Sequence, residues 1–206
     1  EQVIPNEKKT IVPEQVIPNE KKTIVPEQVI PREKNNSTRV ITRNDQCYFD
    51  SIVAEPRIIV TGGAGFIGSL LVKSLAQKHG AEHIMVIDNF WRGKRENIAN
   101  MAVNICDLDL AKITPTTVLK GATIIYHLAD VLAGVDFVFD NEWFVYSSNM
   151  NINTNVMKAV VANRIPKYVY VGTACSFPAY LQMRPGIQAF RENQTYPAEP
   201  ESGYGW

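Results

Sequence analysis

Five short apolar runs, rich in β-branched residues, follow one another along the later part of the chain. They read RIIVT (57–61), HIMVID (83–88), MAVNI (101–105), TIIYH (123–127) and YVYVG (168–172). Continuous apolar runs of this length are typical of strands that are buried on both faces of a sheet. The pattern therefore predicts five strands.

Segments with helical spacing lie between these strands. The apolar face of the first segment consists of Leu70, Leu71, Leu75 and Ala76. A shorter helix is predicted near 110–119, and a long one fills much of 144–164. Strands that alternate with helices predict an α/β fold of the Rossmann type, a doubly wound parallel sheet in the spatial order 3-2-1-4-5.

Residues 1–39 have a different character, because they form a repeat. EQVIPNEKKTIVP occurs at 1–13 and again at 14–26, and a third copy starts at residue 27 and decays. The period is shorter than that of solenoid repeats, and the recurring prolines disfavour both helices and strand ladders. We expect an extended or disordered arm here, followed by a linker at 40–55.

Composition and charge exclude several classes of function. Lys and Arg together number 21, as do Asp and Glu, so the chain has no net charge to attract nucleic acid or an anionic membrane. The three cysteines are an odd set without CxxC spacing, which favours reduced thiols over a disulfide framework or a zinc site. We therefore expect a cytoplasmic protein without a metal, a nucleic-acid partner or a membrane partner.

Three glycines between the first strand and the first helix carry the first chemistry. Gly62, Gly65 and Gly68 form GxxGxxG, which allows a tight turn, a close approach to a pyrophosphate and close helix packing. The helix N-terminus offers N–H groups and a positive dipole end to that anion. Asp88 ends the second strand, where a carboxylate binds both ribose hydroxyls of NAD and repels the 2′-phosphate of NADP. NAD is the predicted cofactor.

Basic residues follow Asp88 closely in the sequence. Arg92, Lys94 and Arg95 lie just downstream and could accept a 2′-phosphate. NADP is therefore the alternative cofactor, less favoured because of Asp88.

The separated motifs together resemble one family. They are TGGAGFIG (61–68), DNF (88–90), CDL (106–108) and HLAD (127–130). In this order they resemble the extended short-chain dehydrogenases/reductases, the NAD-dependent nucleotide-sugar epimerases and dehydratases. The resemblance covers about 57–206 and leaves the repeat outside. It implies that 56–206 is an NAD-binding Rossmann domain, incomplete at its C-terminus and lacking the substrate domain.

The resemblance also implies a set of cofactor-binding residues. In the family, the pair matched by Asp107 and Leu108 borders the adenine, and the segment after the fourth strand runs beside the cofactor. The expected cofactor residues are Gly62, Gly65, Phe66, Ile67, Gly68, Asp88, Asn89, Asp107, Leu108, Leu128, Ala129, Asp130 and Tyr204.

Catalytic residues follow from the same resemblance. Tyr204 matches the Tyr of the family's YxxxK motif, whose Lys would fall two residues after Trp206. Thr173 matches the Ser or Thr that hydrogen-bonds the reacting hydroxyl, with Ser176 as a weaker candidate. In this chemistry the phenolate accepts the proton of a sugar hydroxyl while hydride passes to NAD. Without the Lys, the chain alone is expected to be inactive.

The stretches TACSFP (173–178) and YPAEPESGYG (196–205) most resemble the GDP-mannose 3,5-epimerase branch. ADVLAGVDFVFDN (129–141) lies where that branch has a substrate loop. There Cys175 would act as an acid/base on the sugar ring, because a ketone formed at C4 acidifies the protons at C3 and C5. The resemblance thus implies an isomerase, an NAD-dependent nucleotide-sugar epimerase with a transient oxidoreductase step.

Two alternatives stay open. Another member of the family could be a 4-epimerase, a 4,6-dehydratase, a decarboxylase or a reductase, although TACSFP lacks the Asp-Glu pair of the dehydratases. The other alternative is an inactive dinucleotide-binding fragment. The implied partners are a nucleotide-sugar substrate and a second copy in a homodimer.

Overall fold

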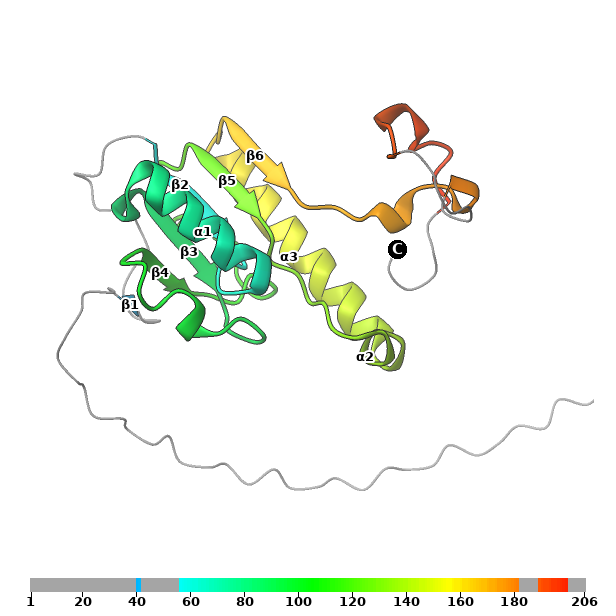
Figure 1. Cartoon of the computed structure of the whole chain (residues 1–206), viewed down its shortest axis with the longest axis horizontal. Helices are drawn as coiled ribbons and strands as arrows, with labels where there is room; N and C mark the ends of the chain where they lie inside the picture. Colours follow the sequence, from blue (N-terminus) through cyan, green and yellow to red (C-terminus); the bar gives the residue numbers. More distant parts are fainter. Residues whose placement is uncertain (1–39, 42–55, 182–188, 200–206) are drawn as a thin grey trace, which may run out of the picture. The chain divides into compact units, whose positions relative to one another are not determined.

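A single parallel sheet forms the centre of the described part of the chain. The computed structural model describes residues 40–41, 56–181 and 189–199, all within the second of the two units, 1–34 and 35–206, into which the chain divides. The strands are β1 Val40–Ile41, β2 Ile58–Thr61, β3 Ile84–Asp88, β4 Asn104–Asp107, β5 Ile124–His127 and β6 Lys167–Tyr170. Their order is β1-β4-β3-β2-β5-β6, and neighbouring strands are parallel (Figure 1).

The predicted topology is confirmed. The five expected strands lie in the order 3-2-1-4-5, and β1 extends the sheet beside β4 from within the stretch expected to be a linker. The third strand begins later than predicted, at Asn104. Its register places Asp107 directly opposite Asp88, which brings two carboxylates to the same edge of the sheet.

Three α-helices accompany the sheet in the described residues: α1 Phe66–His79, α2 Val135–Asp140 and α3 Glu142–Ala162. Single turns of 3-10 helix are η1 Ala81–His83, η2 Arg95–Asn97, η3 Ala174–Ser176, η4 Ala179–Leu181 and η5 Glu192–Gln194. The long predicted helix corresponds to α3. The helix expected near 110–119 is wrong, because this segment forms turns around Pro115, which interrupts a helix and is flanked by β-branched residues.

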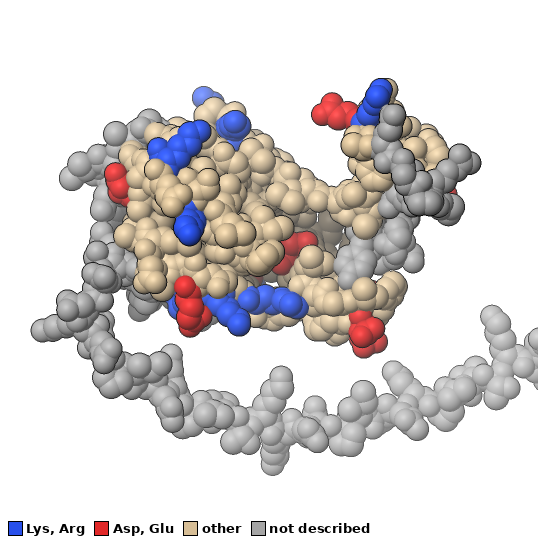
Figure 2. Space-filling view, viewed as in Figure 1, with Lys and Arg blue, Asp and Glu red and all other residues tan. Residues whose placement is uncertain are grey.

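Charged side chains of both signs are spread over the visible face of the domain, and uncharged residues occupy much of its middle (Figure 2). This distribution agrees with the balanced composition. Among the described residues, none of the helices combines the length and apolar character needed to span a bilayer.

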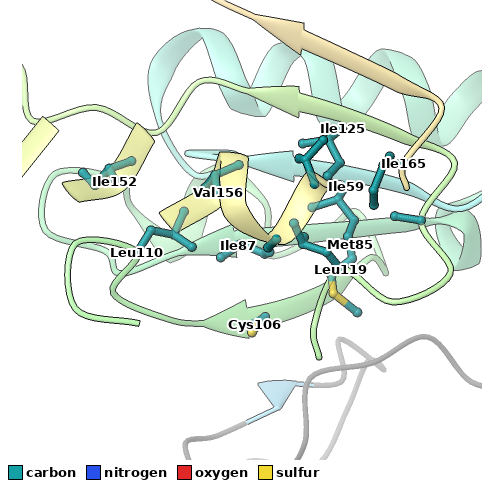
Figure 3. Packing of buried hydrophobic residues seen from close by; sticks show 13 residues of the cluster. Ile59, Met85, Ile87, Cys106, Leu110, Leu119, Ile125, Ile152, Val156 and Ile165 are labelled. Atoms are coloured by element: carbon teal, nitrogen blue, oxygen red, sulfur yellow. The ribbon is translucent and has the colours of Figure 1, made fainter. Parts of the chain in front are cut away.

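Alternate residues of the strands pack against opposite faces of the sheet. On one face, strand side chains meet α3 through Ile59, Met85, Ile87, Cys106, Ile125, Ile152, Val156, Ala159 and Val160 (Figure 3). On the other, they meet α1 through Ile58, Val60, Ile84, Val86, Ile105, Val72 and Leu75. Each fully buried aliphatic side chain contributes about 1.5–3 kcal/mol, so two cores of this size hold the strand ends rigidly in place.

The buried face of α1 differs from the predicted one. Leu75 is buried as expected, but Leu70 is 60% exposed and Val72 takes its place in the core. The helix lies close against the glycine turn at Gly68, and the residues on the same side of the helix, Val72 and Leu75, point inward. The turn at Gly68 sets the rotation of the helix.

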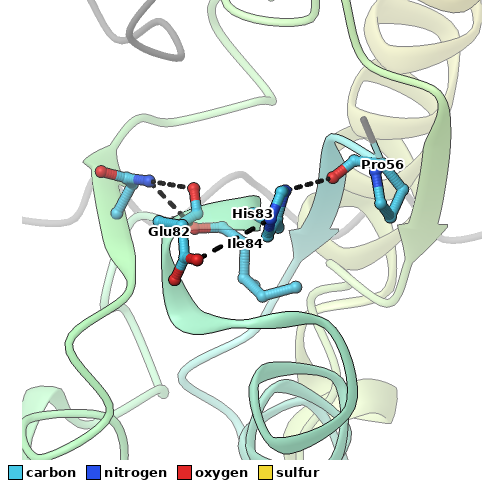
Figure 4. Close-up of polar contacts among 5 residues, drawn as sticks. Pro56, Glu82, His83 and Ile84 are labelled. Atoms are coloured by element: carbon cyan, nitrogen blue, oxygen red, sulfur yellow. Dashed lines mark hydrogen bonds and ion pairs between the residues drawn. The ribbon is translucent and has the colours of Figure 1, made fainter. Parts of the chain in front are cut away.

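Polar contacts connect β2, β3 and β4 at the amino ends of these strands. Asn104 donates from its side-chain nitrogen to the carbonyls of Glu82 and Ile84, at 3.2 and 3.3 Å. The Nδ1 atom of His83 lies 3.0 Å from the carbonyl oxygen of Pro56, just before β2 (Figure 4). These contacts fix β2, β3 and β4 against one another at this end.

The cysteines do not all have the expected redox state. Cys106, on β4, is disulfide-bonded, so the expectation of reduced thiols is wrong at this position. Cys175 is a free cysteine.

Candidate functional site

A cleft opens at the carboxyl ends of β2, β3, β4 and β5. Its lining consists of Gly62, Gly65, Ile87, Asp88, Asn89, Trp91, Arg92, Gly93, Leu108, Asp109, Leu110, Leu128, Ala129, Asp130, Val131 and Ile152. The chain order reverses here, because β3 lies on one side of β2 and β5 on the other. Such a switch point is where open α/β sheets bind ligands.

The glycine turn between β2 and α1 and the first turn of the helix leave no room for a Cβ at Gly62 or Gly68. Gly62 has φ of +68°, and a Cβ there would lie 2.8 Å from the backbone nitrogen of Ala129. A Cβ at Gly68 would lie 2.1 Å from the carbonyl oxygen of Gly62. The turn and the exit of β5 thus meet backbone to backbone, and the first N–H groups of α1 follow directly after the cleft-lining Gly65.

Asp88 ends β3 with its carboxylate at the cleft. Oδ2 accepts a hydrogen bond from Ala64 N at 2.9 Å, and Oδ1 accepts one from Phe90 N at 2.8 Å. The side chain is 8% exposed, and burial raises the pKa of this carboxyl, while the two N–H groups oppose that effect. One N–H bond to each oxygen leaves further lone pairs for a ligand's hydroxyl groups.

The basic residues after Asp88 differ in whether they are available to bind a ligand in the cleft. The Arg95 guanidinium forms an ion pair with Asp107 and lies over the ring of Phe90, 3.8 Å from its centroid. Arg92, by contrast, lines the cleft. Of the two, only Arg92 lines the ligand space.

Trp91 lines the cleft and contacts two further aromatic rings. The Trp91 ring lies 5.9 Å from that of Phe137 and 6.2 Å from that of Phe144, measured between ring centroids. These contacts join the loop after β3 to α2 and the start of α3. Because Trp91 lines the cleft, its fluorescence can report on ligand binding.

Comparison with known proteins identifies the family. Residues 58–206 match the NAD dependent epimerase/dehydratase family. The chain belongs to this family. The family and the parallel sheet are those that the motifs implied.

Relatives of the chain are named for different activities. GDP-mannose 3,5-epimerase of Arabidopsis thaliana is 27% identical over 154 residues, 72% of this chain and 39% of the relative. UDP-glucuronic acid decarboxylase 1 of the same plant is 36% identical over 101 residues, 49% of this chain and 21% of the relative. The UDP-glucose 4-epimerase of Thermus thermophilus, solved in complex with NAD, has a TM-score of 0.60 and 28% identity and covers 72% of this chain and 46% of its own.

The chain is shorter than these family members. It spans 39% of the length of the GDP-mannose epimerase and 46% of the Thermus enzyme. The activity, substrates and partners of a whole family member are therefore proposals for this chain.

The structure brings most of the expected cofactor residues together. Those that line the cleft are Gly62, Gly65, Asp88, Asn89, Leu108, Leu128, Ala129 and Asp130. Gly68 packs beneath the turn, and Asp107 lies opposite Asp88 in the sheet, paired with Arg95. Phe66 and Ile67, at the start of α1, are 84% and 65% exposed.

The structure describes Thr173 and Cys175, two of the three expected catalytic residues. Thr173 caps η3, with its Oγ1 accepting a hydrogen bond from Cys175 N at 3.1 Å. Neither residue is among the described residues that line the cleft, and the Cys175 side chain is half-buried. Tyr204 lies outside the described residues. Their convergence on one site stays a prediction.

Sequence reasoning missed the polar residues behind the cleft. Thr61 and His127 are 0% and 1% exposed at the ends of β2 and β5, and Asn149 and Asn153 lie on α3. A signal was present in the sequence: polar residues end two otherwise apolar strands, and NMNINTN (149–155) puts asparagines, which are weak helix formers, inside a helix.

His127 should make the stability of the fold depend on pH. Burial lowers its pKa from the ordinary 6.5, and the groups that face it are Thr61, Asn153 and the rings of Tyr168 and Tyr170. Burial also raises the pKa of Tyr168 to about 12, so that neighbour stays neutral. The unfolded chain therefore takes up a proton near pH 6.5 and the folded chain only at lower pH, so acid favours unfolding in this window.

We expect the free energy of unfolding to fall as the pH decreases below about 6.5. Urea denaturation at several pH values measures it. His127→Gln should remove this part of the pH dependence, and His79→Gln should retain it. An unchanged profile in His127→Gln would contradict the prediction.

Proposed function

We propose that the cleft binds NAD and that the protein acts on a nucleotide sugar as an epimerase. The observation that carries the proposal is the Asp88 carboxylate, held at the cleft beside a glycine turn that has no room for a Cβ at Gly62. A dinucleotide fits this donor set: main-chain N–H groups at the start of α1 suit a pyrophosphate, and a carboxylate suits ribose hydroxyls.

Individual residues take defined roles in this proposal. Asp88 would accept hydrogen bonds from the ribose, Leu108 would border the adenine, and the backbone of Leu128 and Ala129 would run beside the cofactor. Bound NAD would supply a hydride acceptor for the sugar. The buried apolar residue Ile152, at the far wall, would exclude water from that side.

The catalytic part of the proposal rests on Thr173, Cys175 and Tyr204. Tyr204 would remove the proton from the reacting sugar hydroxyl, and Thr173 would hold that hydroxyl by a hydrogen bond. Once oxidation has made the neighbouring C–H protons acidic, the Cys175 thiolate would remove one of them from one face of the ring. A second acid would then protonate the other face, before the hydride returns to the sugar. The relatives named as GDP-mannose 3,5-epimerases support this choice of reaction.

A decarboxylase is the second candidate, because relatives of that name reach 36% identity over a shorter stretch. Both reactions can be followed by NMR in D2O. An epimerase should incorporate deuterium at C3 and C5 of GDP-mannose, whereas a decarboxylase should release carbon dioxide from UDP-glucuronate. Carbon dioxide release from UDP-glucuronate without deuterium uptake into GDP-mannose would select the decarboxylase.

We expect the chain to bind NAD about tenfold more tightly than NADP, since Asp88 repels a 2′-phosphate and Arg95 is engaged by Asp107. Titration calorimetry with both dinucleotides measures this preference. Removing the charge at the cleft with Arg92→Ala should weaken NADP more than NAD. Equal or tighter binding of NADP by the parent chain would overturn the assignment of NAD.

A further inference from the structure

The buried hydroxyl of Thr61 connects three elements behind the cleft. Its Oγ1 accepts hydrogen bonds from the backbone N–H groups of Leu128 and Ala129, both at 3.2 Å, and lies 2.7 Å from Nδ1 of His127. With two N–H groups directed at the oxygen, its single hydrogen is left for the contact with His127. Thr61 therefore donates, and Nδ1 of His127 accepts.

This polarity determines the tautomer of His127. Since Nδ1 accepts, a neutral ring carries its proton on Nε2, which lies 3.0 Å from Oδ1 of Asn153 on α3. The Asn153 side-chain nitrogen in turn lies 3.5 Å from the hydroxyl of Tyr170 on β6. A directed series of hydrogen bonds thus runs from β2 through β5 to α3.

A second asparagine holds the other end of the same loop. Asn149, one turn before Asn153, accepts from Val131 N at 2.7 Å and donates to the carbonyl of Val131 at 3.2 Å. Residues 128–131, which all line the cleft, are therefore fixed at both ends. A Cβ at Gly62 would lie only 2.8 Å from Ala129 N, so the position of this loop sets the width of the cleft floor.

We propose that Thr61 and His127 are positioning residues of the dinucleotide cleft: they fix residues 128–131 against the glycine turn and so control affinity for NAD without lining the cleft themselves. The proposal rests on the proposed function. It assigns a role to two buried polar residues that the cofactor site does not otherwise use.

The test replaces the hydroxyl group of Thr61 with a methyl group of similar size. Thr61→Val leaves Ala129 N and Nδ1 of His127 without this partner, and we expect NAD affinity to fall about tenfold, the typical effect of a lost buried partner. Thr61→Ser, which keeps a hydroxyl, should restore most of it. The matched control is Thr123→Val, since Thr123 bonds the Arg57 backbone at the opposite end of β5. It should alter thermal stability but not NAD affinity.

Nitrogen-15 NMR of labelled histidine, without NAD, reports the network directly. The parent chain should show His127 protonated on Nε2, and Thr61→Val should lose the Nδ1 acceptor signature. If Thr61→Val does not fold, Asn153→Ala removes the other partner of the ring from a half-buried position, with the same expected loss of affinity.

Two results overturn the inference while leaving the proposed function intact: an Nδ1-protonated His127 in the parent, or unchanged NAD affinity in a folded Thr61→Val or Asn153→Ala. A parent chain that does not bind NAD would overturn both.

Discussion

Replacing Gly68 with alanine should lower the free energy of unfolding by about 3 kcal/mol, at the upper end of overpacking effects, and should abolish measurable NAD binding. The new Cβ would lie 2.1 Å from the carbonyl oxygen of Gly62 and 2.8 Å from the Cα of Gly63. Both neighbours are backbone atoms of the turn that floors the cleft, so either the helix or the turn must move. Urea denaturation and titration calorimetry measure the two effects.

Gly134 provides the matched control. It lies at the start of α2 with φ of −62°, and a Cβ there would meet no atom within 4 Å. Gly134→Ala should therefore change stability by no more than about 0.5 kcal/mol. If Gly68→Ala were as stable as Gly134→Ala and bound NAD normally, the prediction would be wrong, because the close packing of α1 on the turn would then not require a glycine.

The sheet could be predicted from the sequence because its strands are buried on both faces. Runs such as IIVT before Gly62 and IMVID ending at Asp88 are continuous and apolar, and few other elements have that pattern. The glycine spacing and the position of Asp88 also depend only on local order along the chain. The strand runs predicted the strand order, and the glycines and Asp88 predicted part of the cleft lining; the other expected lining residues followed from the family resemblance.

Features that depend on tertiary packing could not be predicted in this way. Whether Leu70 or Val72 faces the core is decided by how closely Gly68 approaches the turn, which helical spacing does not reveal. The segment near 110–119 has apolar residues at both ends, and Leu110 and Leu119 are buried, but Pro115 lies between them. The buried leucines give this segment the apolar pattern of a helix, although it forms turns.

The polar residues behind the cleft show the same limit. Thr61 and His127 are far apart in the sequence and meet only because β2 and β5 pair with Thr61 opposite His127. A single sequence suggests no reason to connect them. By contrast, Asp88 could be assigned a role because its position relative to the glycines is itself the signal.

Replacing Asp88 with alanine should weaken NAD binding about 100-fold, because the carboxylate would be lost as a charged acceptor for two ribose hydroxyls. The change also leaves Ala64 N and Phe90 N without this acceptor, so the loop that follows β3 loses its anchor to the glycine turn. Binding of NADP should change far less, since the repulsion of its 2′-phosphate disappears at the same time. Titration with both dinucleotides should therefore show a reversed or abolished preference.

Glu82→Ala is the control for charge, because Glu82 lies just before β3 at the opposite end of the strand and its side chain is 67% exposed. It removes one negative charge, as Asp88→Ala does, and should leave both affinities within about twofold of the parent, as expected for an exposed charge remote from the cleft. If Asp88→Ala and Glu82→Ala weakened NAD equally, the effect would be one of overall charge. If Asp88→Ala retained full affinity and preference for NAD, another part of the cleft would have to hold the ribose. Asp109, which follows β4 and also lines the cleft, would then be the carboxylate to test.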